Sequence, residues 1–140
     1  MFVSSKEELK KMAGIRAAKY VKNGMKVGLG TGSTVKYTIL ELGRRIKEEN
    51  LEIMCVPTSI ATENLSIENN IQLYELSSLD GLDLVIDGTD EFDKELILIK
   101  GGGGALVREK IIAQASQQMI VVADDSKKVE ILGRFPLPVE

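Results

Sequence analysis

Residues 27–34 read Val-Gly-Leu-Gly-Thr-Gly-Ser-Thr, a short apolar strand that runs into a glycine-rich turn. A helix is predicted over residues 34–49, because Val35, Ile39, Leu42 and Ile46 recur at helical spacing along one stripe. A strand that ends in a tight turn at the start of a helix is typical of α/β proteins, which place ligands where their strands end. This stretch therefore predicts both the fold class and one wall of a ligand site.

The same alternation continues along the rest of the chain. Apolar runs and helical spacing predict strands at residues 51–56, 71–74, 82–86, 96–99 and 119–123, and helices at 4–22, 60–68 and 105–118. Ser4 or Ser5 can cap the first helix. Strands separated by segments of helix length pair parallel, with helices on both faces. We therefore expect an α/β fold with a doubly wound, mostly parallel, Rossmann-like sheet, in a single domain over residues 1–140.

The composition excludes several classes of function. The chain has a net charge of −3, no histidine and one cysteine, Cys55. It lacks the basic excess that neutralises a nucleic-acid backbone, and it has neither an apolar run of ~20 residues nor a signal-peptide core. Acid–base chemistry must come from Asp, Glu, Lys, Tyr or Cys, without a histidine metal site or a thiolate cluster. We expect a cytoplasmic protein that binds neither nucleic acid nor membranes, with Cys55 in the core.

The glycine turn at residues 28–34 fits a single phosphate group better than a nucleotide. A dinucleotide-binding turn needs a third glycine where Ser33 stands, and a P-loop needs a lysine that this turn lacks. Converging backbone N–H groups at a helix start, together with the hydroxyls of Thr31, Ser33 and Thr34, can hold a phosphate. The alternative is an ordinary turn in which Ser33 or Thr34 only caps the helix.

Four carboxylates, Asp87, Asp90, Glu91 and Asp93, follow the strand predicted at 82–86. They could contact sugar hydroxyls and move protons, hold a divalent cation, or form a solvated acidic turn. A calcium-loop pattern is not met. Because Gly88 lets the chain bend, we expect Asp87 and Asp90 to point into one pocket, and Glu91 and Asp93 to be solvated.

The third motif joins Lys100, four glycines and a helix that carries Glu109. A glycine run between a strand and a helix allows a ligand to lie against the backbone, and a lysine at the strand end can stabilise an oxyanion. Glu109 has alanines at both i−4 and i+4, so it could reach into a cavity where burial would raise its pKa. The alternative is a surface glutamate on an ordinary helix.

Taken together, these motifs make the chain resemble ribose-5-phosphate isomerase of the A type. The matching blocks occur in the family's order and cover nearly the whole chain: 28–34, Pro-Thr-Ser at 57–59, Asp-Gly-Thr-Asp-Glu at 87–91, 100–110, Ala-Asp-Asp-Ser-Lys at 123–127, and Gly-Arg-Phe-Pro-Leu-Pro-Val-Glu at 133–140.

The resemblance implies interconversion of D-ribose 5-phosphate and D-ribulose 5-phosphate through an enediol, without a metal or an organic cofactor. It implies Glu109 as the base, Lys100 as the enediolate stabiliser, and Asp87 and Asp90 as catalytic residues that assist ring opening. It also implies a substrate-binding set of Thr31, Gly32, Ser33, Thr34, Asp87, Gly88, Thr89, Asp90, Lys100, Gly101, Gly102, Gly103, Lys127 and Lys10. The family further implies a homodimer or homotetramer.

Two departures from the family pattern are small, and one is large. Thr89 and Gly104 stand where the family usually has alanine. The family continues past Pro-Val-Glu with a smaller α/β domain, so we expect either a truncated chain or a natural short form. The alternative function is a sugar-phosphate-binding fragment or sensor domain with little turnover, although sensors of this kind carry a helix-turn-helix segment that is not found here.

Overall fold

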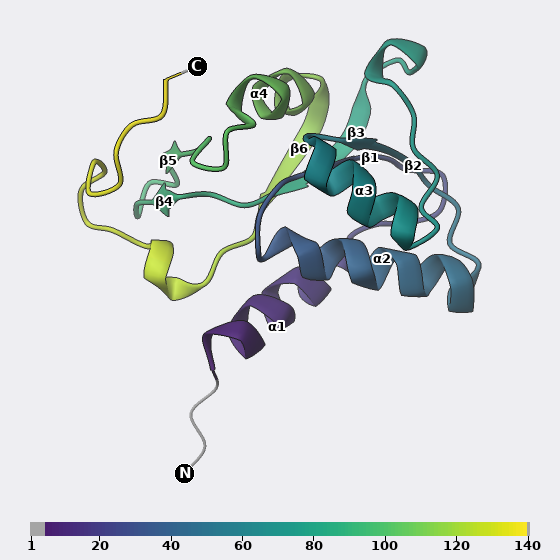
Figure 1. The fold of residues 1–140 in the computed structure, drawn as a ribbon, viewed down its shortest axis with the longest axis horizontal. Coiled ribbons are helices and arrows are strands. Elements are labelled where there is room, and N and C mark those ends of the chain that lie inside the picture. The colour runs from purple at the N-terminus through teal and green to yellow at the C-terminus, as the bar shows by residue number, and fades with distance from the viewer. Residues whose placement is uncertain (1–4, 140) are drawn as a thin grey trace.

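The computed structural model describes residues 5–139, so two expected features, a cap at Ser4 and the final Glu140, lie outside the described residues. The main sheet has four parallel strands in the order β2-β1-β3-β6 (Figure 1). The bounds are β1 (Lys26–Leu29), β2 (Met54–Pro57), β3 (Leu82–Asp87) and β6 (Ser116–Val121). The predicted α/β class and parallel sheet are therefore confirmed.

The strand order creates a crevice beside β1. The chain passes from β1 to β2 on one side, then crosses to β3 on the other side of β1. Gly28 lies opposite both Val56 and Val85, so the carboxyl ends of β1 and β3 are level with each other. Where strand order reverses in this way, the loops after the two strands diverge, and open α/β sheets bind ligands there.

Helices cover both faces of the sheet, as expected for a doubly wound fold. On one face, residues of α1 (Lys6–Ala18) and α2 (Val35–Glu49) pack with Leu84 and Ile86 in the larger core cluster, which α3 (Ile60–Glu68) borders through Leu65. On the other face, Ile112 of α4 (Leu106–Gln114) packs with Val85. Because successive strand residues point to opposite faces, β3 contributes to both clusters. Cys55 is buried in the larger cluster, where desolvation raises the pKa of its thiol to about 12.

The first helix starts at a capping box. Ser5 accepts a hydrogen bond from the backbone N–H of Glu8, and the Glu8 carboxylate accepts one from the Ser5 backbone N–H. These bonds satisfy two donors that a helix start leaves open. The helix ends at Ala18, four residues earlier than predicted.

Three predicted elements differ in the structure. Residues 71–74 form no strand, only a single bridge between Leu73 and Cys55. Residues 96–99 do not join the parallel sheet: β5 (Leu98–Ile99) pairs antiparallel with β4 (Glu91–Phe92) in a separate hairpin. The helix predicted to reach residue 118 ends at Gln114, because the parallel pairing of β6 with β3 already starts at Ser116.

Among residues 5–139, none of the helices has both the length and the apolar character needed to cross a membrane.

Candidate active site

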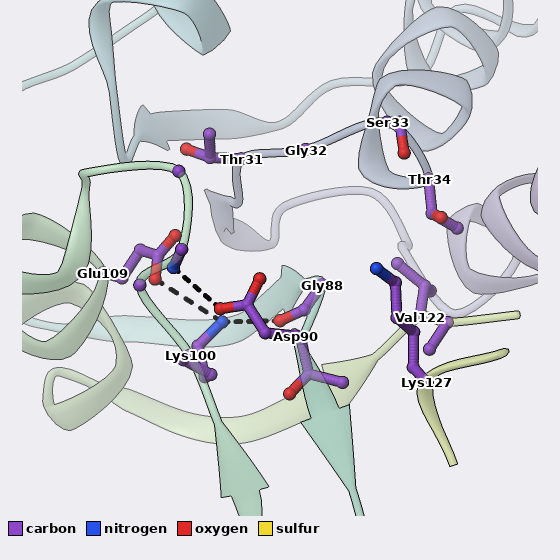
Figure 2. A pocket seen from close by; sticks show the side chains of 15 residues that line it. Thr31, Gly32, Ser33, Thr34, Gly88, Asp90, Lys100, Glu109, Val122 and Lys127 are labelled. Atoms are coloured by element: carbon purple, nitrogen blue, oxygen red, sulfur yellow. Dashed lines mark hydrogen bonds and ion pairs between the residues drawn. The ribbon is translucent and has the colours of Figure 1, made fainter. Parts of the chain in front are cut away.

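A cavity of about 230 Å³ lies at the carboxyl ends of β1 and β3, where the strand order reverses. Figure 2 shows its opposite sides: Glu109, Lys100 and Asp90 on one, and Ser33, Thr34 and Lys127 on the other. The full lining comprises Thr31, Gly32, Ser33, Thr34, Gly88, Thr89, Asp90, Lys100, Gly101, Gly102, Gly103, Glu109, Val122, Ala123 and Lys127. Thirteen residues of the predicted site, all but Asp87 and Lys10, are in this lining.

The first glycine turn is held in place by Asp87. The backbone N–H of Thr31 donates to Asp87 Oδ1 at 3.1 Å. A Cβ at Gly30 would lie only 2.1 Å from the same oxygen, so no side chain fits there. The Thr31 hydroxyl is engaged with Thr58 Oγ1 and Ser59 Oγ, each at 2.8 Å. Packing thus explains Gly30 and the orientation of the Thr31 hydroxyl, while residues 31–34 all line the cavity.

The start of α2 carries no side-chain cap. Thr34 occupies the capping position, but its side chain makes no capping hydrogen bond. Ser33 Oγ instead accepts a hydrogen bond from Lys10 Nζ at 2.9 Å. The alternative of a turn that merely caps its helix does not describe this geometry. The N–H groups at a helix start attract anions, and here two hydroxyls and a nearby cation surround them.

Asp87 lies beneath the cavity and does not line it. Its side chain is fully buried, and Oδ1 also accepts from the backbone N–H of Gly88 at 2.8 Å. Its other oxygen, Oδ2, lies 3.0 Å from Lys100 Nζ. The expectation that Asp87 and Asp90 would both point into the pocket is therefore met only by Asp90. Asp87 instead joins the first turn to Lys100.

Asp90 connects the acidic bend to the second glycine loop. Its Oδ2 accepts from the backbone N–H of Gly102 at 2.7 Å. Thr89 also lines the cavity, but its hydroxyl lies 2.8 Å from the carbonyl oxygens of both Glu91 and Ile99, which share its single hydrogen. Thr89 therefore stabilises the hairpin with its hydroxyl, while Asp90 holds the glycine loop and lines the cavity.

Lys100 and Glu109 meet in a largely desolvated corner. Lys100 Nζ donates to the Gly88 carbonyl at 2.6 Å and lies 3.7 Å from Glu109 Oε1. Glu109 is 4% exposed, and this oxygen has no hydrogen-bond partner among residues 5–139. Burial raises the pKa of Glu109 above its ordinary value of 4.5, the charge of Asp87 raises it further, and Lys100 opposes the shift. A carboxylate whose pKa is moved toward neutrality is suited to general base chemistry.

Two lysines approach the other end of the cavity in different ways. Lys127 lines the cavity from a 3-10 turn over Asp125–Lys127. Lys10 is outside the lining and reaches it through Ser33. Asp124, which is 5% exposed, caps the turn by accepting from the backbone N–H of Ser126 at 2.8 Å. Burial raises the pKa of Asp124, but the bonds from Ser126 and the charges of Lys6 and Lys10 outweigh it, so the net shift is downward.

Glu91 is buried, contrary to the expectation of a solvated side chain. It is 3% exposed and accepts from the backbone N–H groups of Gly133 and Phe135. Asp93 is half-buried and accepts from two N–H groups of the hairpin turn. Val122, Ala123 and Asp124 were not predicted as site residues. These residues directly follow β6, the strand that pairs with β3. Their place after a strand end could have indicated them, as it indicated the acidic residues after β3.

No group of three or more Cys, Asp or Glu side chains within residues 5–139 is arranged to hold a metal ion. The carboxylates of Asp87 and Glu109 both lie within 4 Å of the Lys100 ammonium group instead. The chemistry that these residues can support is therefore proton transfer by a carboxylate, with a lysine beside it to stabilise negative charge on oxygen.

Comparison with known proteins shows to which family the chain belongs. Residues 54–140 match the family model of ribose 5-phosphate isomerase A (phosphoriboisomerase A). The chain is 61% identical over 132 residues to ribose-5-phosphate isomerase A of Bacillus cereus, covering 94% of this chain and 60% of the relative. It is 54% identical over 134 residues to the Streptococcus pneumoniae protein of the same name, covering 96% of this chain and 59% of the relative.

A solved structure of a D-ribose-5-phosphate isomerase in complex with phospho-erythronic acid has the same fold, with a TM-score of 0.90 and 42% identity. The match covers 92% of this chain and 57% of that one. The chain thus spans about three fifths of the length of the relatives that it matches. The resemblance of the sequence motifs is confirmed, and the chain belongs to the ribose 5-phosphate isomerase A family.

Proposed function

We propose that this protein interconverts D-ribose 5-phosphate and D-ribulose 5-phosphate through an enediol intermediate. One observation carries the proposal: a buried glutamate with a raised pKa faces a lysine at one side of a cavity whose other side is suited to a phosphate. Aldose–ketose isomerisation needs a base that moves one proton between neighbouring carbons, and a cation that stabilises the oxygen charge formed between the two transfers.

The phosphate of the substrate binds at the start of α2. Ser33, Thr34 and Lys127 line that side of the cavity (Figure 2). Lys10 is hydrogen-bonded to Ser33. The backbone of Gly32 and the N-terminal turn of the helix add N–H donors, which favour an anion. The solved relative in complex with phospho-erythronic acid supports a phosphorylated ligand for this fold, because that ligand also carries a phosphate on a short polar chain.

Glu109 moves the proton. Its carboxylate takes the proton from C2 of the open-chain aldose, the C2–H electron pair forms the C1–C2 double bond of the enediolate, and the carbonyl oxygen on C1 becomes negative. A proton then passes from the C2 hydroxyl to the oxygen on C1, and return of a proton from the Glu109 carboxyl group to C1 gives the ketose with its carbonyl on C2. Burial makes the carboxylate a stronger base than a solvated glutamate, because it raises the pKa.

Lys100 stabilises the enediolate oxygen together with the backbone N–H groups of the glycine loop. Its ammonium group is fixed by the Gly88 carbonyl and by Asp87, so it is oriented before the substrate arrives. Asp90, on the cavity wall, contacts sugar hydroxyls and assists ring opening, while Asp87 acts through Lys100. Preorganised charge of this kind supplies a large part of many enzymatic rate enhancements.

We further infer that the reaction needs no metal or organic cofactor, and that the protein works in the cytoplasm as a homodimer or homotetramer. The family and the lack of histidine support the first inference. The second rests on the family alone.

A coupled assay that follows ribulose 5-phosphate formation tests the proposal. The 140-residue chain should turn over ribose 5-phosphate, and incubation with EDTA should leave the rate unchanged. Calorimetric binding of ribose 5-phosphate without measurable turnover would instead indicate a sugar-phosphate-binding role. A rate that disappears with EDTA and returns with a divalent cation would contradict the metal-free mechanism.

A further inference from the structure

The carboxylate of Glu91 is buried, although it has no part in the proposed reaction. It lies at the start of β4 and is 3% exposed. Both of its oxygens accept hydrogen bonds from the backbone 42 and 44 residues later in the chain: Oε1 from the N–H of Gly133 at 2.9 Å, and Oε2 from the N–H of Phe135 at 3.0 Å. A carboxylate that receives two backbone donors fixes the segment that supplies them.

The segment held by Glu91 packs against the second glycine loop. A Cβ placed on Gly102 would lie 2.7 Å from Cζ of the Phe135 ring and 2.5 Å from Asp90 Oδ1. Gly102 is exposed, but a side chain at this position would collide with an aromatic ring and a carboxylate. The same glycine donates its backbone N–H to Asp90 and lines the cavity.

A second attachment fixes the beginning of the segment. Lys128 forms a parallel bridge with Phe92, and the Val129 N–H donates to the Phe92 carbonyl at 2.9 Å. Residues 128–135 thus run from the neighbour of Lys127 to the ring that covers Gly102. Figure 1 shows this yellow-green C-terminal stretch passing alongside β4 and β5, away from the main sheet.

We propose that Glu91 and Phe135 are positioning residues for the isomerase reaction. Glu91 holds residues 133–135, and the Phe135 ring then keeps Gly102 in the position where its N–H binds Asp90. We call residues 128–135 the strap. It connects the turn that carries Lys127 with the loop that lies beside Lys100, so it sets the spacing between the two sides of the cavity. This inference rests on the proposed function.

Two matched substitutions, one in the strap and one just beyond it, test the inference. Phe135→Ala removes the ring from Gly102, while Leu137→Ala removes an exposed apolar side chain two residues further along the same segment. We expect Phe135→Ala to lower kcat about tenfold or more, because small displacements of positioning groups have large effects on rate. Leu137→Ala should stay within about twofold of the unmodified protein, since it lies on the surface.

Glu91→Gln tests the hydrogen bonds that hold the strap. Its amide oxygen can still accept, but its NH₂ group faces a backbone donor, so at least one of the two bonds is lost. Glu91 and Phe135 act in one path, so the double variant should lose no more than about twofold beyond Phe135→Ala alone. If the double variant instead loses activity by the product of the two single-variant reductions in kcat, the two residues act separately and the proposal is overturned.

Hydrogen exchange provides a readout that does not depend on turnover. The N–H of Gly102 should exchange about tenfold faster or more in Phe135→Ala and in Glu91→Gln, while the N–H groups of β1 and β3 keep their protection. General loss of protection would show a merely structural effect and would count against positioning, as would an unchanged Gly102 N–H. If the unmodified protein shows no isomerase activity but the variants still exchange the Gly102 N–H faster, the strap is supported and the proposed function is refuted. If the unmodified protein is an active isomerase and the variants keep both its activity and its Gly102 exchange rate, the proposed function is supported and the strap is refuted.

Discussion

The two sides of the cavity bind charge by different means. Around Glu109, three charged side chains lie close together and shielded from water, with Lys100 within 4 Å of both carboxylates. Around Ser33 and Lys127, hydroxyls and a single lysine from a short turn face the opening, and the carboxylate of Asp124 stays outside the lining. On the first side, desolvation raises the pKa of Glu109. On the second side, the start of α2 attracts an anion. The first side should therefore control the rate, and the second should control affinity.

Replacing the base should have the largest effect. Glu109→Gln keeps the shape of the side chain and removes its ability to take a proton, so kcat should fall by about 10² to 10⁴. Binding of ribose 5-phosphate, measured by calorimetry, should change little. Lys110→Gln, which alters an exposed neighbour on α4, serves as the control. A variant that keeps most of its kcat would show that another group takes the proton.

Removal of the lysine charge should come next. Lys100→Met keeps the length of the side chain, and loss of one oxyanion-stabilising group lowers kcat by about 10² to 10³. It also leaves Asp87 and Glu109 facing each other without the cation between them, so the melting temperature should fall. Steady-state kinetics and thermal melts measure the two effects, with the exposed Lys94→Met on the same hairpin as the control. A change in KM with an unchanged kcat would show that Lys100 contributes to substrate affinity and not to the rate, which would contradict its assigned role.

At the opposite side, Lys127→Ala should raise KM about tenfold, which corresponds to ~1.4 kcal/mol, and should leave kcat within about threefold. Lys128→Ala, an exposed lysine beside it, should leave both constants unchanged. Inorganic phosphate should inhibit the unmodified protein competitively and inhibit the Lys127 variant more weakly. A drop in kcat with normal KM would contradict the division of roles between the two sides.

The raised pKa of Glu109 predicts a small effect on stability that depends on pH. A carboxyl group whose pKa is higher in the folded protein contributes stability below its unfolded value, near 4.5, and this contribution is lost as pH rises through the folded pKa. Glu109→Gln should therefore melt a few degrees higher than the unmodified protein at pH 7, since Lys100 keeps Asp87 as its partner. The difference should shrink toward zero below pH 4.5, and a variant that is less stable at pH 7 would contradict the assignment.

Local patterns predicted most of the fold. Apolar strand runs and the helical stripe of α2 placed three of the four strands in the main sheet close to their true positions, because burial on both faces demands continuous apolar residues. The fourth, β6, is an edge strand that reads Ser-Gln-Gln-Met-Ile-Val, and its polar start delayed the prediction by three residues. Pairing with β3, which no local pattern reveals, ends the preceding helix at Gln114.

The candidate site was predictable where glycines and charges cluster in the sequence, and not where distant segments meet. The glycine loops, Lys100 and Glu109 are marked by composition alone. Glu91 was misplaced as solvated because its hydrogen-bond donors, Gly133 and Phe135, lie more than 40 residues later. Asp87 was placed in the pocket for the same reason: only the folded chain brings Lys100 and Thr31 around it and turns it into a buried support.

The most direct test of the account follows a single proton. Ribose 5-phosphate is incubated with the protein in D₂O, and deuterium bound to C1 of the ribulose 5-phosphate formed is measured by NMR. Because the proton held on the Glu109 carboxyl group can exchange with D₂O before it is returned, transfer by this group predicts deuterium at C1 in at least part of the product, and loss of that product in Glu109→Gln. Ribulose 5-phosphate that forms with no solvent deuterium at C1, or that forms equally well in the variant, would contradict the account.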